Sequence, residues 1–237
     1  MNIIPFSTAV KENNIVKLLN VYQGVPVVYD AEVLEIKEGF VRLKVHPLQL
    51  VCLRLNKNTH ISFSNMTYKA IVSSVDIENE MVLLSNIEPC HDFGKRKFVR
   101  VKPSGPTDVD VFVIKTVNTD MGKWLNSTML DISIRGLAVK MDKFMTGLTK
   151  LEVNNLLKLN FYLPSFGEGG DFRMYLDGVV RGIRDIKGTN DVRIGISTSP
   201  GNEAEGFLTR YVSQRQNDIL KSLKQASEQT ESLNNVV

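Results

Sequence analysis

Short runs of alternating apolar and polar residues, separated by turn signals, recur along most of this 237-residue chain. In the first part the runs stand at 26–36, 39–45, 59–63, 68–76 and 81–85. An alternation with a period of two residues is typical of half-buried strands, and the Gly, Asn and Ser residues between the runs favour turns. Five or so short strands at this spacing predict a small antiparallel barrel or sandwich.

A second block of such runs follows, at 108–117, 124–134, 137–141, 156–163, 172–186 and 191–197. Hairpin-like turns separate several of them, and six strands fit a closed antiparallel barrel. The loop at 164–171 carries three glycines, but no helix follows it, which argues against a phosphate-cradling loop. The expected fold class is therefore mainly β, with two small antiparallel β-barrels in tandem.

Two stretches have helical spacing instead. The apolar residues at that spacing near the start are Ile15, Leu18, Leu19 and Tyr22. They predict a helix over 7–21, ended by Gly24. An apolar stripe predicts a second helix over 201–230, whose first half should pack on the second barrel. Its second half is too short for a coiled coil but leaves pairing with a partner helix open, and 231–237 is expected to be disordered.

Composition narrows the function classes. The net charge of +3 gives no whole-molecule basic field, so no binding to a nucleic-acid duplex is expected, and any anion affinity should be local. Cys52 and Cys90 are the only cysteines, which favours a reduced, cytoplasmic setting. The chain shows no signal peptide and no apolar run long enough to span a bilayer, so no membrane insertion is expected. The three histidines are too scattered for a metal site or a catalytic constellation, and we expect neither.

The segment Lys95-Arg96-Lys97-Phe98-Val99-Arg100 places four cations in six positions. Arginine carries a planar fork of donors that can clamp a phosphate or the O6/N7 edge of guanine. The spacing of four between Arg96 and Arg100 keeps both side chains on one side of an extended or a helical segment. A solvated basic linker is the plainer interpretation of this cluster taken alone.

The segment 131–136 changes that balance. Asp131, Ser133 and Arg135 alternate with two isoleucines, as in a half-buried strand, and the apolar parity then slips by one near Gly136. A β-bulge or a tight turn would produce the slip. Asp131 can accept from guanine N–H groups, Ser133 can donate to a phosphate, and Gly136 lets a ligand approach the backbone. A bulged strand whose polar residues face water is the alternative.

Taken together, Arg-x3-Arg at 96–100 and Asp-x-Ser-x2-Gly at 131–136 resemble the signature of the PilZ domain, a bacterial receptor for cyclic di-GMP. The resemblance covers roughly 95–200, and Arg193-Ile-Gly195-Ile is similar to the family's late barrel strand. It implies ligand-binding roles for Arg96, Arg100, Asp131, Ser133 and Gly136. Lys95, Lys97 and Arg135 are further candidates. The family often carries Arg where this chain has Lys95, which leaves the number of bound ligand molecules open.

The resemblance also implies a domain plan and a function. Residues 1–88 resemble in size and strand pattern the split barrel that precedes PilZ in flagellar-brake proteins, 89–95 is the linker and 96–200 the PilZ barrel. The implied function is a non-catalytic cyclic di-GMP receptor, without a cofactor, that changes domain orientation. It would regulate motility, flagellar motor function or biofilm formation through a protein partner, in the cytoplasm or recruited to the flagellar basal body. An interaction module with a degenerate nucleotide site, a flavin-binding enzyme and a homodimer stay open.

Overall fold

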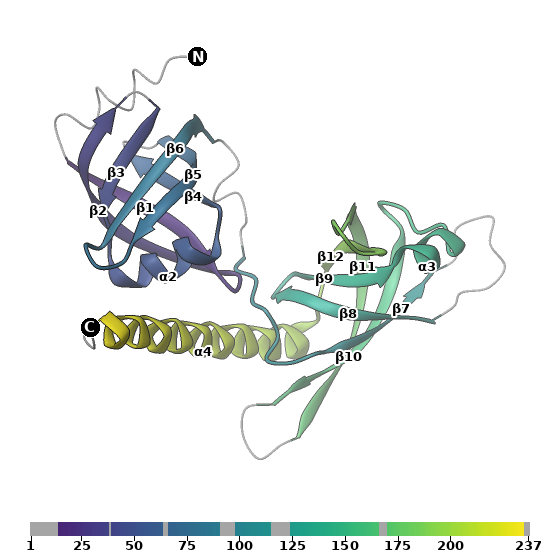
Figure 1. Cartoon of the computed structure of the whole chain (residues 1–237). Coiled ribbons are helices and arrows are strands. Elements are labelled where there is room, and N and C mark those ends of the chain that lie inside the picture. The colour runs from purple at the N-terminus through teal and green to yellow at the C-terminus, as the bar shows by residue number, and fades with distance from the viewer. Residues whose placement is uncertain are drawn as a thin grey trace. The chain divides into compact units, whose positions relative to one another are not determined.

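The computed structural model describes residues 14–37, 39–63, 66–90, 98–114, 124–165 and 170–234, with side chains up to residue 229. The chain divides into two compact units. The first unit comprises Met1–Lys97 and Asp218–Val237, and the second comprises Phe98–Asn217. Each unit is built around one closed six-stranded antiparallel barrel, which confirms the expected fold class (Figure 1).

The first barrel runs in the order β1-β2-β3-β6-β5-β4. Its strands are β1 (Ile15–Tyr22), β2 (Val25–Lys37), β3 (Phe40–Lys44), β4 (Asn58–Phe63), β5 (Met66–Asp76) and β6 (Met81–Pro89). Side chains from alternate positions fill its interior, among them Leu18, Leu43, Ile61 and Leu84, all fully buried. The predicted strands of the first block are thus confirmed.

The predicted helix over 7–21 is wrong in its described part, because residues from Ile15 onward form strand β1. The residues facing the core are Val16, Leu18 and Asn20, which is a period of two. A polar residue at the third inward position hides this alternation in the sequence. Gly24 does not end a helix but closes a two-residue hairpin turn with a positive φ of 93°.

Buried Asn20 has its partner on α2 (Pro47–Leu55), a helix that the sequence analysis did not predict. Gln49 of α2 is fully buried, and its side-chain oxygen accepts a hydrogen bond from the Asn20 amide. The Gln49 amide in turn donates to the carbonyls of Leu18, at 2.9 Å, and Val27, at 3.1 Å. These bonds satisfy polar groups that would otherwise be costly to bury, and they fix α2 to strands β1 and β2.

The second barrel runs in the order β10-β11-β12-β9-β8-β7 (Figure 1). Its strands are β7 (Asp108–Val113), β8 (Trp124–Ser133), β9 (Gly136–Asp142), β10 (Leu156–Pro164), β11 (Asp171–Asp185) and β12 (Asp191–Thr198). These are the six predicted strands, and a short helix α3 (Lys143–Leu148) follows β9. The order β8-β9-β12-β11 is what positions the candidate site described below.

The predicted C-terminal helix is confirmed as α4 (Asn202–Asn234). Its first half packs on the second barrel, as expected, where Phe207 stacks on Phe172 of β11 at 4.2 Å between ring centroids. The later residues belong to the first unit, where Leu223 is buried against Val27 and Cys52. α4 includes 231–234, the beginning of the tail expected to be disordered, while 235–237 lie outside the described residues.

Candidate functional site

A short extended segment brings Arg100 onto the outer surface of the second barrel. Val101 pairs with Ile132 of β8 through two backbone hydrogen bonds, of 2.8 and 3.0 Å. Both side chains are buried, so the pairing is held by apolar packing as well as by the backbone. Because Arg100 and Asp131 adjoin this pair, their side chains are brought close together although 31 positions separate them in the sequence.

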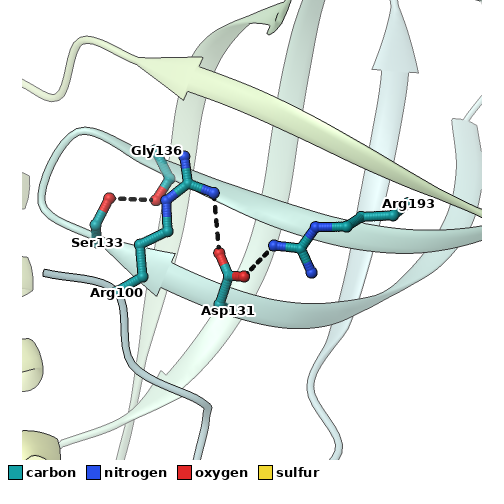
Figure 2. Close-up of polar contacts among 5 residues, drawn as sticks. All are labelled: Arg100, Asp131, Ser133, Gly136 and Arg193. Atoms are coloured by element: carbon teal, nitrogen blue, oxygen red, sulfur yellow. Dashed lines mark hydrogen bonds and ion pairs between the residues drawn. The ribbon is translucent and has the colours of Figure 1, made fainter. Parts of the chain in front are cut away.

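Asp131 lies between two arginines, as Figure 2 shows. Its Oδ1 accepts from Arg100 Nη1 at 3.3 Å, and its Oδ2 accepts from Nη2 of Arg193 on β12. The carboxylate is 17 % exposed, whereas the Arg100 and Arg193 side chains are 29 % and 37 % exposed. The three charged groups therefore form a half-buried cluster that keeps some contact with solvent.

The register of three neighbouring strands explains this cluster. Asp131 of β8 lies opposite Ala138 of β9, and Ala138 lies opposite Gly195 of β12. Small residues at these two positions leave room over the sheet for the long Arg193 side chain, which starts two residues before Gly195. A bulge between Met129 and Asp131 shifts the register of β8 just before Asp131. It lies upstream of the predicted slip in parity near Gly136, which arises instead from the turn that pairs Ile132 with Leu137.

Ser133 and Gly136 flank the two-residue turn that joins β8 to β9, which confirms the predicted tight turn. Ser133 Oγ donates a hydrogen bond to the Gly136 carbonyl at 2.9 Å, as drawn in Figure 2. A Cβ on Gly136 would lie 2.4 Å from the Ile196 carbonyl oxygen. Each residue thus has a role in the barrel itself, and a direct role for either in ligand binding stays a prediction.

Of the remaining candidate ligand-binding residues, only Arg135 lies in the part of the chain that the structure describes. Arg135 points toward α4, where its Nη2 donates to both carboxylate oxygens of Glu205 at 2.7 and 2.8 Å. Its guanidinium is therefore engaged away from the Asp131 cluster. Lys95, Arg96 and Lys97 lie outside the described residues, and their binding roles stay predictions.

Arg193 is not among the site residues that the two sequence motifs predict. Arg193 lies 62 positions after Asp131, in a strand where polar and apolar residues alternate in the ordinary way. Nothing in that local pattern distinguishes it from a solvent-facing arginine. Only the pairing of β12 with β9, and of β9 with β8, places it beside Asp131.

Other chemistry is sparse in the described part of the chain. No group of three or more His, Cys, Asp or Glu side chains in these ranges is placed to hold a metal ion. Burial raises the pKa of the Cys52 thiol to about 12, so that thiol is not a nucleophile at neutral pH. None of the described helices is apolar over enough of its length to cross a membrane.

Residues 94–214, slightly more than half of the chain, match the family model described as "PilZ domain". The chain belongs to the PilZ-domain family. The PilZ match includes the second barrel, the Arg100–Asp131–Arg193 cluster and the first part of α4. A comparison with curated proteins found no match.

Several solved structures are similar to this chain over most of its length. The Bacillus subtilis inhibitor of motility MotI/DgrA is 13% identical, with a TM-score of 0.42, over 86% of this chain and 97% of that one. The MrkH–c-di-GMP complex of K. pneumonia is 14% identical, with a TM-score of 0.41, over 96% and 94% of the two chains. YcgR of Escherichia coli, in complex with c-di-GMP, is 11% identical, with a TM-score of 0.42, over 94% and 92%.

Proposed function

We propose that this chain is a non-catalytic receptor for cyclic di-GMP. The observation that supports the proposal is the half-buried contact between Arg100 and Asp131 on the outside of a PilZ barrel. Arg100 offers a planar cation for a phosphate or for the O6/N7 edge of guanine. Asp131 offers two oxygens to the N1–H and 2-amino donors of a guanine.

The pairing of Arg100 with Asp131 favours a ligand that carries both an anion and a donor edge. Arg100 and Asp131 partly neutralise each other in this structure, so a ligand must replace both halves of the contact. Inorganic phosphate would satisfy Arg100 but would offer no donor to the Asp131 oxygen that Arg100 leaves. A guanine nucleotide with a phosphodiester satisfies the arginine and the carboxylate together.

The position of the motif favours an effector role. Arg96 and Arg100 lie on either side of the boundary between the two compact units, which falls between Lys97 and Phe98. A ligand held by both arginines would contact the segment that joins the units and so change their relative orientation. We propose that this change regulates motility, flagellar motor function or biofilm formation through a protein partner. The protein would act in the cytoplasm and be recruited to the flagellar basal body.

Isothermal titration calorimetry of the full chain with cyclic di-GMP tests the proposal. We expect micromolar or tighter binding, and a ten- to hundredfold loss in Arg100→Ala, because a charge-assisted pair to a phosphate contributes about 1.5–3 kcal/mol. Arg96→Ala should show a similar loss. Lys102→Ala is the matched control, since it removes one cation from an exposed position two residues from Arg100. Small-angle scattering with and without ligand tests the change in orientation. No heat with the unaltered chain would refute the receptor function.

The second candidate is an interaction module with a degenerate nucleotide site. The observation in its favour is that both oxygens of Asp131 are engaged by arginines of the chain itself. Such a module would form its protein complex regardless of cyclic di-GMP. A complex whose affinity is the same with and without the nucleotide would favour this candidate, and sedimentation velocity over a concentration series would show whether the partner is a second copy.

A further inference from the structure

We propose that Arg193 is a third arginine of the ligand site, and that it positions Asp131 for guanine recognition. The inference rests on the proposed cyclic di-GMP function and adds a residue that the two sequence motifs do not contain. Figure 2 shows Arg100 and Arg193 on opposite sides of the Asp131 carboxylate, each bonded to a different oxygen. Arg100 comes from the segment before the barrel, whereas Arg193 comes from β12, a strand inside it.

The two arginines differ in how firmly the fold holds them. Arg193 lies between Val192 and Ile194, which are both buried, and its backbone pairs with β9 and β11. Arg100 stands outside the named strands, on a segment that pairs with β8 next to it only at Val101 and Ile132 among the described strand pairings. Arg193 is therefore the fixed partner of Asp131, and Arg100 is the partner that can exchange.

The place of Arg193 in the sheet supports a functional role. Its cross-strand neighbours in register are both cations, Lys140 on β9 and Arg184 on β11. Like charges directly opposite one another destabilise a sheet, so three cations in a row are unfavourable for folding alone. Lys140 approaches Asp191 at 3.7 Å, and Arg193 turns to Asp131. These three cations keep a positive charge on this part of the barrel surface, where it would attract an anionic ligand.

Ligand binding then becomes an exchange of partners around a carboxylate that stays paired. When Arg100 turns to a phosphate of the ligand, Asp131 loses one cation but keeps Arg193. The half-buried carboxylate therefore keeps a cationic partner and its direction, with oxygen lone pairs available to the guanine donors. Without Arg193, the departure of Arg100 would leave Asp131 with no described cationic partner, and the exchange would be more costly.

A double-mutant cycle measured by calorimetry with cyclic di-GMP tests this role. The variants are Arg193→Gln, Asp131→Asn and the pair combined, with Arg184→Gln as the matched control. Arg184→Gln removes the same charge from the position directly across from Arg193, and among the described contacts Arg184 makes none with Asp131. Arg193→Gln should bind about tenfold more weakly, Arg184→Gln less than about twofold, and Arg193→Lys should restore part of the loss.

The coupling is the decisive measurement. If Arg193 acts through Asp131, Arg193→Gln should lower the affinity for cyclic di-GMP by less than about twofold in a protein that already carries Asp131→Asn. Arg193→Gln should also reduce the selectivity for guanine. Adenine lacks the N1–H and 2-amino donors that Asp131 would accept, so the affinity for cyclic di-GMP relative to cyclic di-AMP should fall about tenfold in this variant. A purely structural role for Arg193 would lower both affinities equally.

The outcomes separate the two proposals. Suppose the unaltered protein binds cyclic di-GMP but the losses of binding free energy in Arg193→Gln and Asp131→Asn simply add. The role of Arg193 would then be overturned, and the receptor function would stand. Unaltered protein that binds no cyclic di-GMP would overturn both. Each variant is checked by urea unfolding, and if Arg193→Gln does not fold, the same cycle is run with Arg193→Lys.

Discussion

Replacing Gly136 by alanine should destabilise the second barrel whether or not a ligand is present. The added Cβ would lie 2.4 Å from the Ile196 carbonyl oxygen and 3.3 Å from the Ser197 Cα. Both neighbours are backbone atoms of β12, which pairs with β9 at this point, so no side-chain rotation relieves the clash. The two strands would have to separate by at least about 0.6 Å. Overpacking of this kind typically costs about 1–3 kcal/mol.

The chain supplies its own reporter for this measurement. Trp124 is the only tryptophan, and it lies on β8 of the second barrel, beside Phe112 at 5.2 Å between ring centroids. Urea unfolding followed by tryptophan fluorescence therefore reports the second unit alone, which matters because a chain of two units need not unfold in one step. A loss of about 1–3 kcal/mol should lower the melting temperature of this unit by roughly 4–12 °C.

Gly182→Ala is the matched control. Gly182 lies on β11, beside β12 in the same sheet, and a Cβ there would meet nothing within 4 Å. This variant should be as stable as the unaltered chain, or slightly more stable because alanine restricts the unfolded state. If Gly136→Ala unfolded at the same urea concentration as Gly182→Ala, the steric explanation of Gly136 would be refuted and a role only in ligand approach would become the better account.

Three further predictions concern the first barrel, where Cys52 serves as the reporter. Its thiol is fully buried against Val27 and Leu223, and its pKa is raised to about 12. In a Cys90→Ser background it should therefore react with iodoacetamide at neutral pH only when α2 or α4 moves away from this cluster. Gln49→Ala should leave buried polar groups unsatisfied, cost about 1–3 kcal/mol of stability, and speed this labelling roughly ten- to hundredfold. An unchanged rate would contradict the conclusion that the Gln49 hydrogen bonds fix α2 to β1 and β2. Burial and nearby Lys69 lower the pKa of His60, so the unfolded chain takes up a proton at higher pH than the folded chain does. Stability should therefore fall as the pH drops below about 6.5. Chemical unfolding followed by circular dichroism measures this fall, and His60→Gln should abolish it.

The barrels were predictable because their strands alternate in a regular way, and the errors arose where a buried polar residue interrupts that regularity. Asn20 occupies an inward position of β1, and an apolar residue is normally expected there. Its partner Gln49 is also fully buried and gives α2 a polar residue on its inner face. Each residue looks solvent-facing by itself, and only their pairing in three dimensions explains both.

The candidate site was predictable in part for a related reason. The two motifs supply Arg100 and Asp131, and the sequence predicted that they would act together. Their actual contact depends on the Val101–Ile132 backbone pair, which no local pattern reveals, and Arg193 depends on the register of three strands. Residues brought together by register leave no periodic signal, because each keeps the alternation of its own strand.

The motif residues consequently call for different interpretations when they are mutated. Ser133 and Gly136 hold the turn between β8 and β9 and the contact with β12, so weaker ligand binding in their variants would mix a folding effect with a binding effect. Arg100, Asp131 and Arg193 lie on the outer surface and are partly exposed, so their replacement should disturb the barrel less. Affinities measured for variants at those three positions therefore report recognition most directly. The stability of each variant, followed by Trp124 fluorescence in urea, shows how much of a loss in affinity is due to unfolding. A large loss of binding in Ser133→Ala with unchanged barrel stability would show that the serine contacts the ligand in addition to closing the turn.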